Sequence, residues 1–409
     1  MRGVRFATAT AAVVALLTTA TGAGAAAPRQ GGAEPFVIGV INAEGSPSFD
    51  FPEYRQAIEA AAKYANAKLD GINGSEIELE TCNTKGSGEG SDACAQQLID
   101  AGAQIVLAAL PVFVAHDTFA AAGIPVIGNV PILPSDFTAE NAAYFGGGNP
   151  GVMASIAIYL KENLGAKRVG IVSTTNPAGA TALPLLTDAL DELGVEYQVA
   201  TGGDAEADYT PLFRAANDPE ADAFVSLYAG EGCTGTMSAL DQLRQTDPVF
   251  DKPAVTTALC ASESVIESVG EAARNWHFSG GGIEVRKPKT KDPDAKLYRS
   301  AMKKYNEEGL VVGGFSVPGF QLLMTTRAAA VAVAEQEGTK GAPSGQAIFD
   351  SIKSNPADIE VFITHEKLDC GVLPDRPAVC VLANPFTSYV KNGKFKLTAE
   401  RIDPTPLLG

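Results

Sequence analysis

The residues with the most specific chemistry in this sequence are its six cysteines. They fall into three local pairs separated by long cysteine-free stretches, and no C-x-x-C spacing is present, which argues against a zinc site. In an exported chain such pairs form disulfides, each stabilising by about 2–3 kcal/mol in the chain-entropy model. The sequence therefore predicts three bonds: Cys82–Cys94, Cys233–Cys260 and Cys370–Cys380.

Other groups suited to catalysis are sparse. Three histidines (His116, His277 and His365) leave little material for a metal site or a proton relay, and no G-x-S-x-G, P-loop lysine or H-E-x-x-H motif occurs. The run 146–150, GGGNP, precedes a predicted helix and could bind an anion, but no lysine follows it, so we expect a hinge there. A pair of carboxylates, as in glycosidases, remains an alternative. We expect no enzyme, no metal and no cofactor.

Composition limits the class of protein. The chain has 409 residues, with 31 Lys and Arg against 48 Asp and Glu, and a net charge of −17. The length suggests two or three folded domains, and a composition that is 45% hydrophobic and only 19% charged excludes a disordered chain. The acidity argues against binding to nucleic acid or to anionic lipid, because both need clustered Lys and Arg.

The first 25 residues have the layout of a signal peptide. Arg2 and Arg5 precede an apolar stretch over 7–17, and Ala23-Gly24-Ala25 is a cleavage site of the A-x-A type. The apolar stretch is shorter than the ~20 residues that span a bilayer, although an N-terminal helix or anchor is the alternative. No lipobox cysteine follows it. We expect export to the periplasm or the cell-envelope exterior, and no other stretch that spans a membrane.

Apolar runs alternate with helical periodicity along the rest of the chain, which is typical of a doubly wound α/β protein. A first unit has predicted strands at 36–41, 77–80, 104–108 and 125–128, with helices opening at Asp50 and at Ser91. A second unit follows Pro150. Its predicted strands lie at 168–173, 195–200, 223–227, 253–257 and 276–279, followed by a long helix over 315–336 and a loop-rich tail from Asp369. Two such units predict two lobes with a cleft between them.

Ligands of open α/β sheets bind at the carboxyl ends of the strands. We therefore expect the loops near Asn42, Ala109, Asn129, Ser173 and Tyr228 to face the cleft. These loops position any ligand-binding side chain.

Three segments show a resemblance to a known family. The strand at 37–40 with a helix near Glu53, the step GIPVI at 123–127 and the strand KRVGIV at 167–172 occur in the family's order and spacing. Over most of 35–390 the chain resembles the type I periplasmic solute-binding proteins of ABC importers, in the leucine/isoleucine/valine-binding group. Each segment alone is weak, but their order, the export signal and the length make the resemblance fairly specific.

The resemblance implies a binder, not a catalyst. Two lobes joined by three crossing segments would close on one small molecule and present it to the permease subunits of an ABC transporter, with no nucleic acid involved and the protein as a monomer. By analogy the first lobe spans 35–148 plus 282–358, and the second spans 149–281 plus 359–409. A ligand-sensing protein of the same fold is a further alternative.

The departures from the family pattern concern the ligand. Where the amino-acid binders offer serine hydroxyls to the α-carboxylate, this chain reads ALPVF at 109–113, and Val130-Pro131 aligns with an Ala-Thr pair. A family tyrosine aligns near Ala178, and the acidic partner of the α-ammonium lands near Cys260, with Glu231 or Glu263 as possible substitutes. A buried zwitterion without partners costs several kcal/mol. The sequence thus favours a larger, less polar ligand, such as an aromatic, fatty or steroid-type acid, over a branched-chain amino acid.

Nine residues are candidates for ligand contact, and each has a structural alternative. Phe49 and Phe51 fit a hydrophobic staple at a helix start equally well, and Phe113 fits the lobe core. Tyr228 is the strongest candidate because an aromatic residue at a strand end beside glycines suits a cleft floor. We expect His116 to be a surface or core histidine and Trp276 to be a core residue. The full set is Phe49, Phe51, Leu110, Val112, Phe113, Pro131, Ala178, Tyr228 and Glu231.

Overall fold

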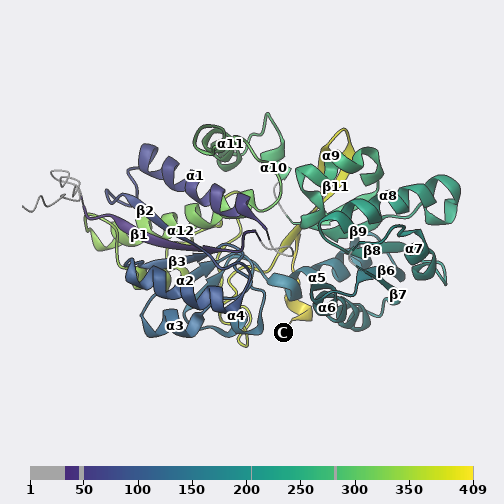
Figure 1. The fold of residues 1–409 in the computed structure, drawn as a ribbon, viewed down its shortest axis with the longest axis horizontal. Coiled ribbons are helices and arrows are strands. Elements are labelled where there is room, and N and C mark those ends of the chain that lie inside the picture. Colours follow the sequence, from purple (N-terminus) through teal and green to yellow (C-terminus); the bar gives the residue numbers. More distant parts are fainter. Residues whose placement is uncertain (1–32, 46–49, 204, 281–282, 409) are drawn as a thin grey trace, which may run out of the picture. The chain divides into compact units, whose positions relative to one another are not determined.

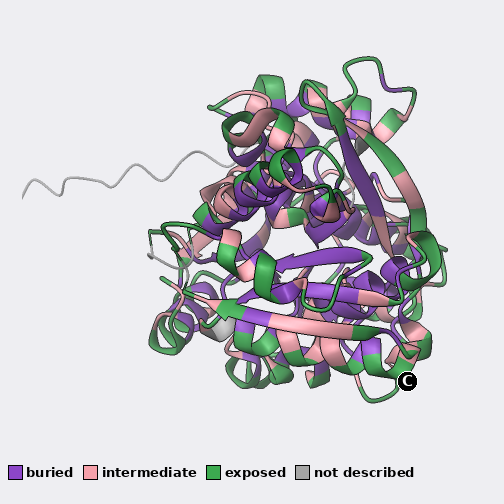
Figure 2. Ribbon diagram, turned by 90° about the vertical axis from the view of Figure 1, so that its right-hand side faces the viewer, coloured by how far each residue is buried: buried purple, intermediate pink, exposed green. Residues whose placement is uncertain are grey.

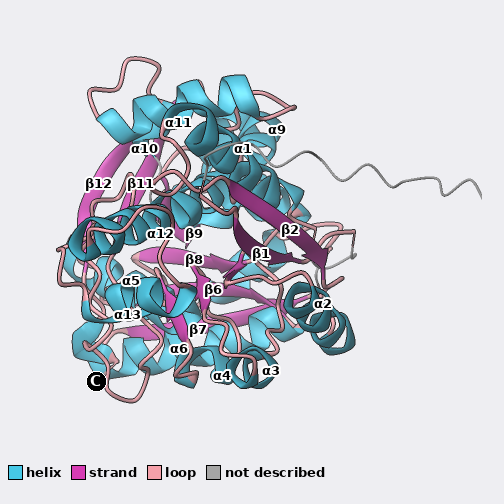
Figure 3. Cartoon of the chain, turned by 90° about the vertical axis from the view of Figure 1, so that its left-hand side faces the viewer, coloured by secondary structure: helices cyan, strands magenta, loops and turns pink. Residues whose placement is uncertain are grey.

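A computed structural model describes residues 33–45, 50–203, 205–280 and 283–408 (Figure 1). The predicted signal peptide and Phe49 lie outside these residues. The described chain forms two sheets, of five and seven strands, with helices packed against them (Figure 3). Most strand residues are buried between the helices (Figure 2).

The first sheet is entirely parallel and has the order β2-β1-β3-β4-β5. Its core lies on both faces: Val40, Ile58 and Phe320 are buried together on one face, and Leu98 and Phe119 are buried on the other. We call this sheet and the helices packed on it the first half. Its strands are β1 (Phe36–Asn42), β2 (Ile77–Asn83), β3 (Ile105–Ala108), β4 (Val126–Gly128) and β5 (Ala142–Tyr144). Its helices are α1 (Pro52–Lys68), α2 (Gly88–Asp100), α3 (His116–Ala121), α4 (Pro134–Thr138), α10 (Ile283–Arg286), α11 (Pro293–Tyr305), α12 (Ser316–Glu337) and α13 (Gly345–Ser354).

The second sheet has the order β12-β11-β10-β9-β8-β6-β7, and only β11 and β12 run antiparallel to their neighbours. Together with its helices it forms the second half. The parallel strands are β6 (Arg168–Thr174), β7 (Glu196–Gly202), β8 (Ala223–Leu227), β9 (Ala254–Thr257) and β10 (Trp276–Ser279), and the last two are β11 (Asn384–Lys391) and β12 (Lys394–Ile402). Its helices are α5 (Gly148–Ile158), α6 (Pro177–Leu193), α7 (Thr210–Ala216), α8 (Glu231–Thr246) and α9 (Glu263–Val269). Trp276 belongs to its core, as expected.

The tail beyond residue 369 was expected to be loop-rich, and this expectation was wrong. β11 and β12 form a hairpin there, joined by Asn392-Gly393, both with positive φ. Asn-Gly is the strongest short-range signal for a two-residue hairpin turn. The flanking strands lack strict alternation of apolar and polar residues, which explains why the hairpin was missed.

Two predicted helix caps were also wrong. α1 begins after Phe51, and Asp50 instead accepts a hydrogen bond from the backbone N–H of Gly45 at 2.9 Å. α2 is capped by Ser87, which accepts the Gly90 N–H at 3.0 Å, and not by Ser91. Both corrections shift a helix end by a few residues and leave the alternation of strands and helices unchanged.

The segment after α13 packs with the first half. Ile359, Val361 and Leu368 belong to the buried cluster of the first sheet, and Val379 forms a β-bridge with Tyr144 of β5. The sequence-based boundary had placed 359–409 with the second lobe. The chain instead reaches the second sheet only at Asn384, because the apolar side chains between 359 and 382 are buried against the first one.

Of the helices in the described ranges, α12 alone is long and apolar enough to cross a membrane by length and composition. The sequence predicts this helix, over 315–336, but no second stretch apolar enough to span a membrane. However, 72% of its most apolar window is buried inside the protein, where Phe320 and Leu323 pack beneath the first sheet. A core helix passes the same test, because burial on all sides makes a helix apolar all round.

All three predicted disulfides are confirmed. Cys82 at the end of β2 bonds Cys94 of α2, with Cα atoms 5.5 Å apart. Cys233 of α8 bonds Cys260, which follows β9, with Cα atoms 5.3 Å apart. The third bond, Cys370–Cys380, closes a ten-residue separation in the segment that returns to the first sheet.

In the glycine run at 146–148, Gly148 occupies a position where both the backbone conformation and the space available disfavour a side chain. Gly148 has φ +59°, and a Cβ atom on it would lie 2.4 Å from the carbonyl oxygen of Pro131. Gly165 has a similar φ, +68°, with no atom within 4 Å of such a Cβ. We expect Gly165→Ala to cost about 1 kcal/mol through φ alone and Gly148→Ala to cost roughly 2–3 kcal/mol, measured by urea unfolding. Equal costs would show that the contact with Pro131 can relax.

His277 in the second half has a lowered pKa, because its surroundings disfavour the protonated ring. Nδ1 of His277 lies within hydrogen-bonding distance of the hydroxyl of Tyr159, at 2.7 Å, and burial, aided by the charges of Lys396 and Arg244, lowers the pKa of His277 to about 4. The unfolded chain, with its ordinary histidine pKa near 6.5, binds more protons between those values, so stability falls as pH drops through this window.

We therefore expect the wild type to lose roughly 2–3 kcal/mol more than His277→Asn as the pH is lowered from 7 to 4. Asparagine keeps an acceptor for Tyr159 but does not titrate in this range. The measurement is the free energy of unfolding in urea at several pH values. Parallel pH profiles for the two proteins would contradict the assignment.

Candidate functional site

The carboxyl edge of the first sheet is organised by Asn42, the last residue of β1, which is 1% exposed. Its side-chain oxygen accepts the N–H of Leu110 at 3.2 Å, and its amide nitrogen donates to the carbonyl of Phe51 at 2.8 Å and to Glu44 at 3.1 Å. One amide therefore joins the loop after β1, the loop after β3 and the start of α1. Buried polar groups need such partners, so the three segments are fixed relative to one another.

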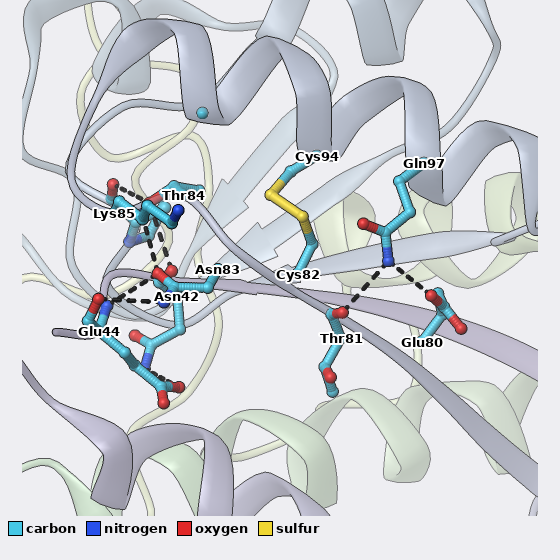
Figure 4. Close-up of a disulfide and its surroundings, with 12 residues drawn as sticks. Asn42, Glu44, Glu80, Thr81, Cys82, Asn83, Thr84, Lys85, Cys94 and Gln97 are labelled. Carbon is cyan, nitrogen blue, oxygen red and sulfur yellow. Dashed lines mark hydrogen bonds between the residues drawn. A yellow bond between two sulfur atoms is a disulfide. The ribbon is translucent and has the colours of Figure 1, made fainter.

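Glu44 lies beside Asn42 at this edge (Figure 4), and its charge is paired with that of Arg55. The guanidinium of Arg55 donates to both of its oxygens, at 2.7 and 3.1 Å. Burial alone would raise the pKa of Glu44, but the hydrogen bonds from Arg55 and Asn42 outweigh it and hold the pKa below its ordinary value. Asn83 completes the arrangement by bonding the backbone N–H and carbonyl of Glu44, each at 3.0 Å. Glu44 is thus a paired carboxylate at neutral pH.

The loop after β3 presents apolar side chains only. Leu110 and Val112 are buried, whereas Phe113 is 37% exposed and is one of three large hydrophobic residues of the described chain at the surface. Val112 has φ +69°, a conformation that costs a β-branched residue free energy and is concentrated at functional sites. The hydroxyl of Thr84 donates to the carbonyl of Pro111 at 2.9 Å and so ties this loop to the end of β2.

The loop after β4 lies against the glycine run. Pro131 is buried, and its carbonyl oxygen is the atom that a Cβ on Gly148 would meet first. Asn129 donates to the carbonyl of Pro318 at 2.6 Å, which joins this loop to the first turn of α12. The loop is therefore in contact with the point where the chain leaves the first half for α5.

The carboxyl edge of the second sheet has a different character. Asn176 caps α6 by accepting the Gly179 N–H at 2.9 Å, and Ala178 belongs to the first turn of that helix. Glu231 is exposed as the first residue of α8. Tyr228 is only 3% exposed, and its ring packs edge-on against Tyr209 with centroids 5.1 Å apart.

The predicted site residues therefore lie in two groups, one at the carboxyl ends of the strands of each sheet. Phe51, Leu110, Val112, Phe113 and Pro131 share the edge of the first sheet, and Ala178, Tyr228 and Glu231 follow strands of the second. Their contact with a ligand stays a prediction, and the side chain of Tyr228 belongs to a core cluster.

Sequence reasoning missed two features of the first edge. The first is the role of Asn42, for which an asparagine ending a fully apolar strand was the available signal. The second is Phe315 at the start of α12, whose ring centroid lies 4.9 Å from that of Phe51. These residues are 264 positions apart in the chain, so no local pattern could connect them.

Within the described ranges, no three or more His, Cys, Asp or Glu residues are grouped so as to hold a metal ion. Two surface pockets of the described residues lie elsewhere, and neither is lined by a predicted ligand-binding residue. One lies beside Arg168 and Glu196, at the amino ends of β6 and β7, and the other lies between α3, α4 and α13. The candidate site is therefore formed by the loops at the carboxyl ends of the strands in the two sheets.

A family comparison agrees with this architecture. The family model for periplasmic binding proteins matches residues 35–368. The chain belongs to the periplasmic binding protein family. The resemblance noted from the sequence, to type I solute-binding proteins of ABC importers, and the predicted α/β fold class are confirmed. Members of this family are extracytoplasmic proteins that bind small solutes and work with ABC transporter permeases.

Solved structures share the fold over nearly their whole length. A leucine-binding protein from Thermotoga maritima is 16% identical, with a TM-score of 0.68 over 91% of this chain and 99% of the other. A branched-chain amino acid transporter substrate-binding protein from Streptococcus pneumoniae, in complex with isoleucine, is 18% identical, with a TM-score of 0.67 over 88% and 98%. An ABC transporter substrate-binding protein from Sphaerobacter thermophilus is 15% identical, with a TM-score of 0.71 over 91% and 98%. No curated protein matches the chain.

The role of Asn42 in this periplasmic binding protein can be tested directly. Asn42→Ala would leave the N–H of Leu110 and the carbonyl of Phe51 without their side-chain partner in a buried place, which we expect to cost about 2–3 kcal/mol. Asn83→Ala removes a side chain that bonds the same loop from an exposed position, where water replaces it, so its cost should stay below about 1 kcal/mol. Urea unfolding measures both, and similar costs would contradict the central role of Asn42.

Proposed function

We propose that this protein is the solute-binding component of an ABC importer of the branched-chain amino acid type, and that it closes two lobes on a small, rather apolar organic ligand. Aromatic, fatty and steroid-type acids are the ligand classes that we propose. Catalysis forms no part of the proposal.

The course of the chain supports a hinge. It passes between the two sheets after β5, after β10 and before β11, so three segments join the halves. We propose a first lobe of about 33–147 plus 283–382 and a second of the remaining described residues. Near the joints, Arg286 of α10 donates to the carbonyl of Ala261 and lies over the ring of Phe395, 4.5 Å from its centroid. A ligand closes such a hinge only as far as it binds the closed state better than the open one.

The observation that supports an apolar ligand is the loop after β3. It offers Leu110, Val112 and an exposed Phe113 where an amino-acid binder of the family would offer hydroxyl groups to a carboxylate. An α-carboxylate buried against these side chains would lose its hydration without gaining partners, which costs several kcal/mol. The apolar part of a ligand that contacts Phe113 would instead gain binding free energy, because the contact removes the ring of Phe113 from water.

Two alternatives follow from specific observations. The neighbour from Streptococcus pneumoniae was solved with isoleucine. In this chain Glu231 and Glu263 are exposed at the starts of α8 and α9, where either could pair with an ammonium group, so a branched-chain amino acid is the second candidate. A ligand-sensing role on the same fold is the third.

A thermal-shift screen separates the ligand classes. The probes are leucine, isoleucine and valine on one side, and benzoate, octanoate and cholate on the other. At 100 times its dissociation constant a ligand stabilises the protein by about 2.7 kcal/mol, a shift that is readily measured. We expect a shift from at least one acid of the second group. A shift from the branched-chain amino acids alone would overturn the apolar-ligand proposal in favour of the second candidate.

The contribution of Phe113 to binding is tested by measuring the affinity of Phe113→Ala for whichever probe binds the wild type. Loss of a side-chain contact of this size should weaken affinity about 10- to 100-fold by isothermal titration calorimetry. Leu397→Ala is the control, because Leu397 is similarly exposed, at 42%, but lies on β12, the outermost strand of the second sheet, which β11, β10 and β9 separate from β8. Equal affinities for the wild type and Phe113→Ala would remove Phe113 from the site.

A further inference from the structure

A buried polar cluster lies beneath the candidate site and has no part in the function proposed so far. It consists of His116, Asp136 and Tyr144, all buried. Nε2 of His116 lies 2.9 Å from Oδ1 of Asp136 and 3.4 Å from the hydroxyl of Tyr144. The helices that provide the first two residues, α3 and α4, lie side by side below the first sheet (Figures 1 and 3).

Each member of the cluster comes from a segment that belongs to the candidate site. His116 is the first residue of α3, three positions after Phe113. Asp136 lies in α4, and its Oδ2 accepts the N–H groups of Ile132 and Leu133, each at 2.8 Å, directly after Pro131. A hydrogen bond between His116 and Asp136 therefore connects the loop after β3 to the loop after β4.

Tyr144 extends this connection to the hinge. It is the last residue of β5, immediately before the first crossing segment at 145–148. Its backbone N–H donates to Ala378 at 2.6 Å, and its carbonyl accepts the N–H of Cys380 at 2.9 Å, on the segment that leads to the third crossing. Gly128 at the end of β4 leaves room for the ring, because a Cβ atom there would lie 2.6 Å from it.

The bonding pattern assigns roles to these groups. A carboxylate only accepts hydrogen bonds, so Asp136 accepts three N–H groups and His116 donates through Nε2. Nδ1 of His116 is buried and has no hydrogen-bond partner among the described residues. Burial, together with the charge of Asp136, raises the pKa of Tyr144 well above its ordinary value, so its hydroxyl remains protonated.

We propose that His116 and Asp136 are positioning residues of the ligand site: they hold the loops at 109–113 and 130–133 in one arrangement and, through Tyr144, link that arrangement to the first crossing segment. The coupling of the loops is a property of the protein without ligand. Its importance for binding rests on the function proposed above.

Hydrogen exchange of the full-length, ligand-free protein, read by mass spectrometry, tests the coupling. In His116→Ala we expect exchange to become on the order of tenfold faster at Ile132 and Leu133 as well as in 109–115, because Asp136 loses the partner that fixes it. His116→Gln should restore slow exchange at both loops, since its amide N–H can donate to Asp136 from the position of Nε2. Asp136→Asn keeps an oxygen for the two backbone N–H groups and should disturb the loop at 109–115 more than 130–133.

Asp222→Ala is the matched control. Asp222 also accepts two consecutive backbone N–H groups, those of Lys167 and Arg168 at 2.8 and 3.0 Å, but at the amino end of β6 in the second half. Its removal should speed exchange around 167–168 and leave 109–115 and 130–133 unchanged. Faster exchange in His116→Ala that stops at 109–121, or an equal effect of Asp222→Ala on the site loops, would overturn the coupling.

The two proposals can fail separately. If none of the six screened probes shifts the melting temperature, the function proposed above fails while the exchange result stands. If a probe binds and the coupling is real, His116→Ala should weaken its affinity about tenfold and His116→Gln should recover it. Unchanged affinity in His116→Ala would overturn the positioning role for binding.

Discussion

Parallel strands bring all their carboxyl ends to one edge of a sheet, and at that edge the chain must satisfy backbone groups that no further strand can reach. The first half solves this with one buried amide. Asn42 satisfies groups on the loop after β3 and on the start of α1, and the carbonyl of Asn42 itself accepts the N–H of Thr84 at 2.9 Å. The loops that would meet a ligand owe their positions to this residue.

Below that edge the hydrogen bond between His116 and Asp136 connects the loops after β3 and β4. Asp136 and His116 are buried, so their hydrogen bonds are made in a medium of low dielectric constant, where an unmade bond is costly. In the candidate site this polar support lies beneath a loop with apolar side chains, of which Leu110 and Val112 are buried and Phe113 is exposed. Rigid support beneath an apolar contact surface reduces the entropy lost on binding.

Much of this architecture could be predicted from local pattern. The strand over 36–41 is apolar because a parallel strand is buried on both faces, and the cysteine pairs are close enough in sequence for each to close a modest loop. The hairpin of β11 and β12 was missed although its Asn392-Gly393 turn is a strong signal, because its strands are irregular in polarity. Local pattern could not show that the segment after residue 358 packs on the first sheet, because its apolar residues could pack on either sheet.

The sequence by itself determined which segments become strands and helices, which cysteines pair and which family the chain resembles, because each of these depends on residues that are near in sequence or on their order. Only the tertiary structure decided that Phe315 lies on Phe51, that Tyr228 packs in a core and that His116 bonds Asp136. The first of these contacts joins residues 264 positions apart and the last joins residues 20 apart, and whether two such side chains meet depends on how whole elements pack. Packing is set by the summed burial of many side chains, and no short pattern records it.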